Sequence, residues 1–392
     1  MALMRLLRRQ DGISRADLVE LSGLMPSTVS VLTKQLIDEG WLVEAAARAT
    51  PALGRRPTPL RLDGTRIVLL GADLGPDAIR VAATSIRGEV LDVAHSPLRS
   101  RDPNQARKQL ASMVTSLCAR VLRRNRRLLG IGVALHGLVD KRSGMLEFAP
   151  NIGWRRVEFG RPLAVDLKAA GLGHVPMYFH NEADLAAVGE SEFCEGPVDD
   201  PLVYVSCGVG VGAGIVLNEE LFTGVSGSAG EIGHTTLVID GAPCSCGRLG
   251  CAESYIGLRS IAAAAGALRD DGIDRVALRN GVASRTAPAL NAFAMGGRSL
   301  GVLMQNVWST FNPQTIVLGG ETVTLGSDVL IDSATSVLAD FAGRAGLKPP
   351  SVRLARHGDL AAAIGGAAYV LHATLHPHQT SLHTEYVAPT EA

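Results

Sequence analysis

The strongest chemical signal in the sequence is a group of three cysteines, Cys244, Cys246 and Cys251, that falls within eight residues. Glycines between them let the backbone turn tightly around a common centre. His234 lies ten residues before the first cysteine. Three thiolates and one imidazole satisfy a tetrahedral Zn²⁺ ion and leave no position for a reacting water. The spacing therefore predicts a structural zinc site in which His234 is the least secure ligand; the alternative is three reduced, buried cysteines.

Two carboxylates flank this cluster. Glu231 precedes it, and Glu253 follows the last cysteine by two residues. A bound metal would stiffen the loop and keep these carboxylates close together, and the second ring nitrogen of His234 would need a partner of its own. Carboxylates accept hydrogen bonds from hydroxyl groups. Together, Glu231, His234 and Glu253 predict a site for a hydroxyl-rich ligand. For each glutamate taken alone, the alternative is a surface charge.

Two further segments carry amide and carboxylate groups that suit a polyol. Asn151 stands near Trp154, and Asn181 and Glu182 follow the apolar run at 177–179. Polar side chains just beyond the carboxyl end of a strand commonly line the ligand crevice of α/β sheets. For Asn181 a second interpretation remains open, because Asn is also a preferred N-cap and a helix is expected at 183–193.

The first 45 residues predict three short helices. Ser14 is a plausible N-cap for a helix at 15–22, Gly23 supplies a turn, and Pro26 suits the first turn of the third helix. A helix, a turn containing glycine and a second helix with a polar outer face are typical of the helix-turn-helix motif. Val29, Leu32 and Leu36 form the inner face of the third helix, and its outer face is expected to carry Thr28, Ser30, Thr33 and Lys34.

A wing is expected after this motif, from a strand beginning at Trp41 to a strand at 60–62. The loop between them contains Arg55 and Arg56, which suit phosphates or a narrow minor groove; the alternative is a solvated linker. Residues 1–66 hold 10 Lys and Arg against 7 Asp and Glu, a balance of +3 that permits a nucleic-acid-binding module. The predicted DNA contacts are Ser27, Thr28, Ser30, Lys34, Arg55 and Arg56.

From residue 67 the pattern alternates between strands and helices, which predicts a layered α/β body. Strands are expected at 67–73, 78–84, 88–94, 129–135, 175–179, 202–206, 213–217 and 315–320. Helices are expected at 104–127, 183–193, 254–268 and 299–311. The arginines of 104–127 are expected to form a solvated face, and the tail at 376–392 has little pattern and is expected to be disordered.

Composition excludes several classes of protein. A hydrophobic share of 46% against 19% charged residues allows a sizeable core and argues against disorder. No run of about 18 apolar residues predicts a membrane span, and the arginines near the start argue against a signal peptide. Six cysteines in 392 residues are too few for a disulfide scaffold. A cytoplasmic protein is expected.

Taken together, these motifs resemble those of the ROK family of sugar kinases and sugar-responsive repressors. The resemblance covers residues 67–372 and is carried by the segments 231–234, 244–253, 150–154 and 316–320. Residues 1–62 resemble the DNA-binding head of the repressor branch. The cysteine motif is highly specific, whereas the glycine-rich pieces are weak when taken singly.

The resemblance implies an actin-like (ribonuclease H-like), two-lobed ATPase fold with sugar bound in the cleft. Its expected parts are a winged helix-turn-helix at 1–66, a first lobe at 67–180 completed by a C-terminal helix near 357–375, and a second lobe at 181–356. It implies zinc held by His234, Cys244, Cys246 and Cys251, and a homodimer or homotetramer on a two-fold operator. The implied sugar contacts are Gly137, Asn151, Asn181, Glu182, Glu231, His234 and Glu253.

Three departures from the kinase pattern predict that ATP is not used. Kinases of this family carry Asp-x-Gly-Gly-Thr in the first phosphate loop, whereas this chain has Pro76 and Asp77 at the last two positions. Pro76 removes a backbone N–H, and Asp77 places a negative charge near the phosphates. Val209 replaces a hydroxyl residue in the second loop. Glu182 replaces the aspartate that serves as general base, and a shift of about 1 Å can cost roughly a hundredfold in rate.

The hypothesis from the sequence is a non-enzymatic, sugar-responsive transcriptional repressor that a sugar or sugar derivative releases from operator DNA. One alternative is an ATP-dependent sugar kinase with an added DNA-binding head. A second is a regulator whose cleft no longer takes sugar and which a partner protein releases from DNA.

Overall fold

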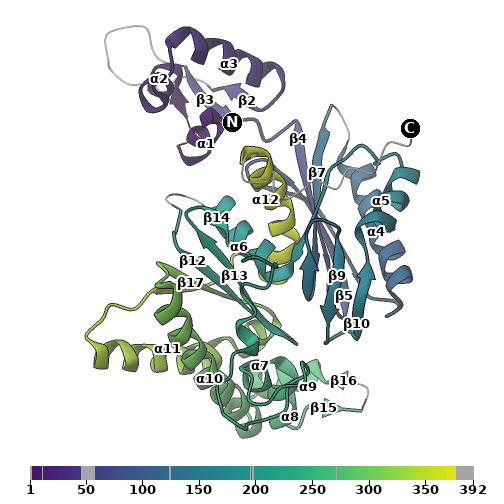
Figure 1. The fold of residues 1–392 in the computed structure, drawn as a ribbon, viewed down its shortest axis with the longest axis vertical. Helices are drawn as coiled ribbons and strands as arrows, with labels where there is room; N and C mark the ends of the chain where they lie inside the picture. Colours follow the sequence, from purple (N-terminus) through teal and green to yellow (C-terminus); the bar gives the residue numbers. More distant parts are fainter. Residues whose placement is uncertain are drawn as a thin grey trace.

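The computed structural model describes residues 2–376, apart from residues 11, 46–57, 123–124, 195, 197 and 271. An N-terminal module of helices lies at one end of an elongated body, and the body contains two five-stranded sheets with helices around them (Figure 1). No helix within the described part of the chain is both long and apolar enough to cross a membrane.

The N-terminal module consists of three helices and a small antiparallel sheet. Its helices are α1 (Ala2–Arg9), α2 (Arg15–Ser22) and α3 (Pro26–Asp38), and its strands β1 (Ile13–Ser14), β2 (Leu42–Glu44) and β3 (Pro59–Leu62) pair in the order β1-β3-β2. Ser14 begins α2 through a capping box with Asp17, and Gly23 ends it in the left-handed region with φ 66°. These local signals explain why the helix boundaries expected from the sequence agree with the structure.

One side chain of α3 does not lie where the sequence predicts. Thr33 is buried rather than on the outer face. Its Oγ1 donates to the carbonyl of Val29 at 2.8 Å and accepts from Nε of Arg15 at 3.1 Å. Thr33 therefore joins α3 to α2 and is not available at the surface.

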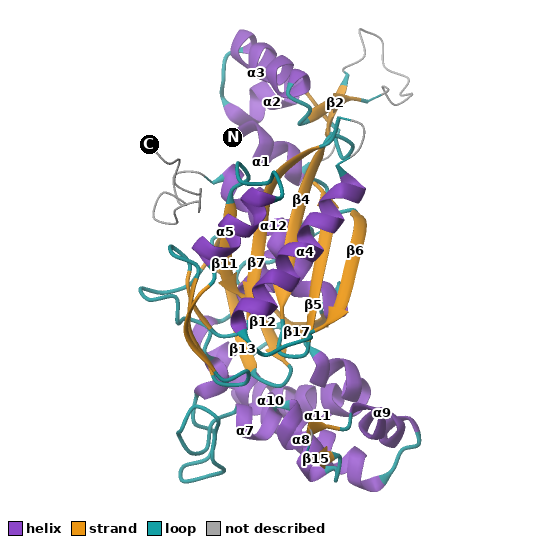
Figure 2. Cartoon of the chain, turned by 90° about the vertical axis from the view of Figure 1, so that its right-hand side faces the viewer, coloured by secondary structure: helices purple, strands orange, loops and turns teal. Residues whose placement is uncertain are grey.

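The first lobe has the sheet order β11-β7-β4-β5-β6. Strands β4, β7 and β11 are parallel, and β5 and β6 continue the sheet antiparallel. A separate hairpin sheet has the order β10-β9-β8. Helices α4 and α5 cover one face of the large sheet (Figure 2). The elements are β4 (Ile67–Leu74), β5 (Ala78–Ser85), β6 (Val90–Pro97), α4 (Pro103–Val121), β7 (Arg127–Leu135), β8 (Leu138–Asp140), β9 (Met145–Ala149), β10 (Trp154–Glu158), α5 (Gly160–Ala169) and β11 (Met177–Asn181).

The second lobe has the sheet order β14-β13-β12-β17-β18. Helices α10 and α11 pack on one face of this sheet, and smaller helices extend the lobe beyond it (Figure 1). The elements are α6 (Glu182–Glu192), β12 (Leu202–Cys207), β13 (Val211–Leu217), β14 (Glu220–Leu221), the 3₁₀ turn η1 (Ile232–His234), α7 (Glu253–Ile256), α8 (Leu258–Ala264), β15 (Leu268–Arg269), β16 (Gly272–Ile273), α9 (Arg275–Ala283), α10 (Ala287–Phe311), β17 (Thr315–Gly319), α11 (Glu321–Ala345) and β18 (Ser351–Leu354).

Two helices lie between the sheets of the lobes. Helix α12 (Ala361–Leu375), preceded by the 3₁₀ turn η2 (Gly358–Leu360), packs on β4 and β7 of the first lobe. Helix α6 packs on β12 and β13 of the second lobe and against α12. The C-terminal helix thus packs on the first lobe, and the α6–α12 pair connects the two halves.

Several expected helices have different limits in the structure. The helix expected at 104–127 ends at Val121, because Arg127 instead begins β7 and donates its N–H to the carbonyl of Arg66. Arg120 lies near its end and pairs with Asp92 at the surface. The helix expected at 254–268 is divided at Gly257, because the N–H of the following Leu258 bonds to the carbonyl of Gly208.

The expected tail begins one residue too early. His376 is buried, and its Nδ1 lies 3.1 Å from the carbonyl oxygen of His372 in α12. Residues 377–392 lie outside the described part of the chain.

Candidate functional site

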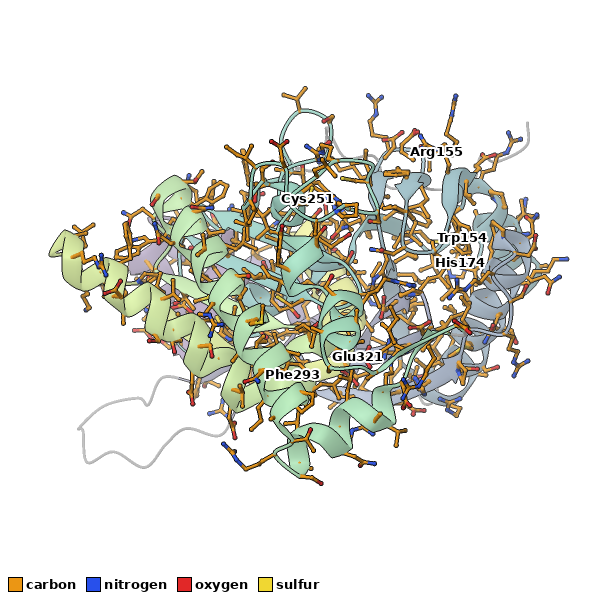
Figure 3. The ribbon with its side chains drawn as sticks, turned by 90° about the horizontal axis from the view of Figure 1, so that it is seen from below. Trp154, Arg155, His174, Cys251, Phe293 and Glu321 are labelled. Carbon is orange, nitrogen blue, oxygen red and sulfur yellow. The ribbon has the colours of Figure 1, made fainter. Side chains whose placement is uncertain are left out.

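A cleft of about 860 Å³ lies between the two lobes. Asn151 of the first lobe and Glu321 of the second both line it. In the view from below, the labels of Trp154 and Glu321 mark the two lobes (Figure 3). The seven residues that the resemblance assigns to sugar contacts all line this one cleft: Gly137, Asn151, Asn181, Glu182, Glu231, His234 and Glu253.

Asn151 lies in the turn between β9 and β10, at the side of the cleft formed by the first lobe. Trp154, whose ring the sequence places close to Asn151, does not line the cleft. Its ring is buried, packs against Phe159 and donates Nε1–H to the carbonyl of Arg101 at 2.8 Å. The aromatic ring therefore holds the turn in place from below, and Asn151 faces the ligand space without it.

Asn181 has the capping role that the sequence left open. Its Oδ1 accepts the N–H of Ala183 at 2.8 Å, and its Nδ2 donates to the carbonyl of Gly137 at 2.9 Å. The side chain therefore starts helix α6 and ties it to the first lobe. An amide has two donors and two acceptor lone pairs, so one of each remains for a ligand.

Glu182 supplies the clearest unmet hydrogen-bonding capacity in the cleft. Within the described part of the chain, its Oε2 is buried and has no hydrogen-bond partner. Burial raises the pKa of this carboxyl group, and the neighbouring charge of His136 opposes that shift. An unpartnered carboxylate oxygen at a cleft is costly unless a ligand donor reaches it.

A group of charged side chains beneath Glu182 was not predicted from the sequence. His136 Nε2 lies 2.8 Å from Asp73 Oδ1, and Arg80 Nη1 lies 3.5 Å from the other oxygen of Asp73. Burial alone would lower the pKa of His136, but Glu182 and Asp73 outweigh it and raise the value to about 9. His136 is therefore cationic at neutral pH and compensates the carboxylates in the floor of the cleft.

The predicted metal ligands converge in the structure. Ligand atoms of His234, Cys244, Cys246 and Cys251 all lie within 4.8 Å of one another. The Sγ atoms of Cys246 and Cys251 are 3.7 Å apart, and Nδ1 of His234 is 3.6 Å from Sγ of Cys244. Zn–S bonds of about 2.3 Å at tetrahedral angles place two sulfur atoms about 3.8 Å apart, so the donor set and its spacing fit a zinc ion.

The electrostatics of the thiols also fit a cation. Burial and the neighbouring thiols raise the pKa of Cys251 to about 12. Burial also acts to raise the pKa of Cys246, but hydrogen bonds from Arg248 outweigh it and lower the value. A divalent cation stabilises the thiolate forms, because metal binding and loss of the thiol proton are linked.

The two glutamates beside this cluster have different surroundings. Glu231 Oε2 lies 3.7 Å from Nε2 of His234, so the nitrogen that faces away from the cysteines has a partner. Glu253 is buried; its Oε1 accepts from Ser245 Oγ at 2.8 Å and its Oε2 accepts the N–H of Val211 at 3.1 Å. Glu253 thus fastens the cysteine loop to β13, whereas Glu231 is more open to a ligand.

An ion-pair bridge crosses the other half of the cleft. Arg275, at the start of α9, contacts Asp77 Oδ2 of the first lobe at 2.5 Å and Glu321 Oε1 of the second lobe at 2.7 Å. Asp77 lies in the turn between β4 and β5, the segment that matches the first phosphate loop of the kinases. Arg275 is therefore neutralised by two carboxylates, one from each lobe.

The N-terminal module exposes the predicted polar residues of α3. Ser27, Thr28, Ser30 and Lys34 are all exposed. Arg55 and Arg56, the predicted wing contacts, lie outside the described residues.

Two α/β lobes enclosing one cleft, with a pair of helices between their sheets, make an actin-like sugar-kinase body. The chain belongs to the ROK family, because the model of that family matches residues 69–373.

Known proteins related to this chain include both regulators and enzymes. It is 31% identical over 329 residues to a xylose repressor of Caldicellulosiruptor bescii, with 80% of each chain covered. It is 29% identical to a glucokinase of Halalkalibacterium halodurans, covering 76% of this chain and 93% of that enzyme. A solved ROK family transcriptional regulator, a homologue of the E. coli MLC protein, superimposes with a TM-score of 0.76 at 23% identity and covers 95% of this chain and 94% of its own.

Proposed function

We propose that this protein is a sugar-responsive transcriptional repressor. Its N-terminal module binds operator DNA, and a sugar or sugar derivative in the cleft lowers that affinity. The observation that carries the proposal is that one chain combines two features. One is a cleft that contains an unpartnered carboxylate oxygen, and the other is an N-terminal module that exposes a hydroxyl-rich helix. The xylose repressor, related over most of both chains, supports the same assignment.

For DNA binding, we assign α2, the turn at Gly23 and α3 as a helix-turn-helix, with β2 and β3 as the strands of a wing. The side chains at the exposed start of α3 are short, so its backbone can approach base edges and phosphates closely. Lys34 adds a charge for a phosphate. Arg55 and Arg56 fall between β2 and β3, where a wing would reach the DNA backbone or minor groove.

For sugar binding, the proposed contacts come from both lobes. Asn151 offers donors and acceptors from the first lobe, and Glu182 and Glu231 offer carboxylate oxygens from the second. A ligand that bridges these groups stabilises a closed arrangement of the lobes over an open one, because only the closed arrangement provides both sets of contacts. Such differential binding is what allows a ligand to shift the DNA-binding state.

We further propose that a structural zinc ion is held by His234, Cys244, Cys246 and Cys251. The ion would complete a closed four-ligand site and supply no catalytic water. Its role would be to fix the orientation of His234, whose Nε2 then directs Glu231 toward the cleft.

The nucleotide half of the cleft favours a regulator over a kinase. Asp77 and Glu321 surround Arg275, so the phosphates of ATP would meet two carboxylates and would have to displace an existing ion-pair bridge. Pro76 removes a backbone donor from the same turn. These features support a cleft that binds sugar without phosphorylating it.

Release of DNA by sugars tests this proposal. Fluorescence anisotropy of a labelled fragment from the gene's own promoter region is followed while common pentoses and hexoses, including D-xylose and D-glucose, are added. We expect the protein to bind the fragment in the absence of sugar and to release it when one sugar, or one of a small group of sugars, is added. A protein that never binds the fragment, or that binds it with the same affinity in every sugar, contradicts the proposal.

A coupled assay for ATP consumption with the same sugars separates the repressor from the kinase. We expect no turnover above background. Robust sugar-dependent consumption of ATP, with the phosphoryl group transferred to the sugar, would identify an active kinase. The absence of any binding heat in calorimetry against the same sugars would favour a regulator released by a partner protein.

A further inference from the structure

Helix α6 runs from the proposed sugar site to the N-terminal module. Asn181 caps its first turn at the cleft, and Glu182 begins it. Its 11 residues span roughly 16 Å at 1.5 Å per residue. The last residue, Glu192, is buried at the opposite end, far from the cleft.

At that far end Glu192 joins three elements. Its Oε2 lies 2.5 Å from Nη1 of Arg8 in α1, and the same Nη1 donates to its backbone carbonyl at 2.9 Å. Its Oε1 lies 2.8 Å from Nδ1 of His372 in α12. The side chains of Arg8, Glu192 and His372 are all at most 10% exposed, so these contacts are little screened by water.

This junction is an ion-pair network and not a metal site, although Glu192, His372 and His376 are close enough together to hold a metal ion. The 2.8 Å contact of His372 Nδ1 with Glu192 is a hydrogen-bond distance, and Nε2 of His372 faces Glu220 at 3.5 Å. Arg8 and a protonated His372 balance the two carboxylates of Glu192 and Glu220. A divalent cation bound by His372 would displace its proton and leave one additional positive charge beside Arg8, which is unfavourable in a buried setting.

Helix α6 is packed too tightly to bend between its two ends. Residues 183–192 of this helix are all buried. A Cβ added at Gly365 of α12 would lie 1.9 Å from the carbonyl oxygen of Leu185, and one added at Gly214 of β13 would lie 2.1 Å from that of Ala183. Such close contacts leave no room for α6 to bend or compress, so it can only pivot as a rigid body about its crossing with α12, and a displacement at Asn181 is carried to Glu192.

The N-terminal module is part of the same packed unit. Leu3, Met4 and Leu7 of α1 belong to one hydrophobic cluster with Leu185 of α6 and Tyr369 of α12. Figures 1 and 2 both show α1 next to one end of α12. The module is therefore not attached by a linker alone, and its orientation depends on the end of α6 and α12.

We propose that helix α6 transmits sugar binding to the DNA-binding module through the contacts of Glu192 with Arg8 and His372. This inference rests on the proposed function and specifies how the cleft controls DNA affinity. Closure of the lobes on a ligand moves the Asn181 end of α6 relative to the first lobe, and the rigid helix changes the position of Glu192. Since Arg8 follows Glu192, α1 and with it α3 turn relative to the operator.

The variant Arg8→Met tests this, because it removes the ion pair but keeps a long apolar side chain. Arg5→Met is the matched control: Arg5 is exposed on the same helix and loses the same charge. For each protein, the Kd for the promoter fragment is measured with and without a saturating sugar from the panel. A coupling of about 1–3 kcal/mol gives a ratio of roughly 5 to 150 in the wild type. We expect the ratio to fall toward one in Arg8→Met and to stay within twofold of wild type in Arg5→Met, with sugar affinity unchanged in both.

Glu192→Gln provides a second variant that keeps the size and one hydrogen bond of the side chain, and we expect it to lower the ratio as well. Wild-type ratios in both Arg8→Met and Glu192→Gln would overturn the inference. Hydrogen exchange of the α1 amides gives a readout that does not need DNA: sugar should change their protection in the wild type and not in Arg8→Met. If the wild type binds sugar but not DNA, the repressor assignment fails while this comparison still tests the junction; equal responses in both proteins overturn it.

Discussion

Replacement of Gly365 by Ala tests the tight packing between α6 and α12. The new Cβ would lie 1.9 Å from the carbonyl oxygen of Leu185. Carbon atoms and carbonyl oxygens in proteins approach to about 3.3–3.6 Å, so the two helices would have to separate by roughly 1.5 Å. The obstructing atom belongs to the backbone and cannot rotate away. Overpacking of this kind typically costs about 1–3 kcal/mol, and the rigid surroundings place this site at about 3 kcal/mol or more, even after the better helix propensity of Ala.

Guanidinium unfolding followed by far-ultraviolet circular dichroism measures this loss as a lower midpoint. Gly343→Ala is the matched control, because Gly343 also lies in a helix but an added Cβ would have no neighbour within 4 Å. It should leave stability unchanged or raise it by up to about 1 kcal/mol. An unfolding midpoint for Gly365→Ala equal to that of Gly343→Ala would refute the close approach of α6 and α12.

Three further changes have defined outcomes. Ser14→Ala removes the cap of α2 and should lower the stability of the N-terminal module by about 1 kcal/mol, seen as faster amide exchange in α2; unchanged exchange would argue against the capping box. Cys246→Ser should reduce bound zinc well below one equivalent in elemental analysis, and full retention would show that the ligand set is wrong. Burial alone would lower the pKa of His372, but hydrogen bonds with Glu192 and Glu220 outweigh it and raise the value to about 9 from 6.5. Its contribution to the free energy of unfolding, on the order of 3 kcal/mol, is therefore complete below pH 6.5 and lost as the pH rises through 9. Denaturation at pH 7 and pH 10 measures how much of the free energy of unfolding is lost between these two values. The loss should be smaller in His372→Gln than in the wild type, and an identical loss would count against the ion pair.

The parts of the fold that the sequence predicted best are those fixed by local interactions. Ser14, Gly23 and Pro26 act within one or two turns of the chain, and the limits of α2 and α3 agree with the structure. The buried strands at 67–73 and 315–320 were also identified, because continuous apolar runs flanked by glycine are typical of central strands.

Elements whose limits depend on distant contacts were missed or shortened. Helix α10 begins at Ala287 and not near 299. The sequence placed its start too late because Gly296 and Gly297 look like helix breakers. In the structure an added Cβ at Gly297 would lie 2.4 Å from the carbonyl oxygen of Leu330, so this glycine serves close packing against α11. The long helix α11 was not predicted at all.

The candidate site divides in the same way. The cysteine cluster could be recognised because its ligands lie close in sequence, and its convergence in the structure follows from that spacing. His136, Asp73 and Arg80 come from three different strands or their ends, and only the register of the sheet brings them under Glu182. The contact between Arg8 and Glu192 joins residues that are 184 positions apart, so no local sequence pattern predicts it.

Linkage between sugar binding and DNA binding is the most direct test of a sugar-responsive repressor. Calorimetry measures the affinity of the releasing sugar for the protein alone and for the protein saturated with promoter DNA. We expect bound DNA to weaken sugar binding by the same factor by which the sugar weakens DNA binding. A sugar affinity that is identical with and without bound DNA would contradict it.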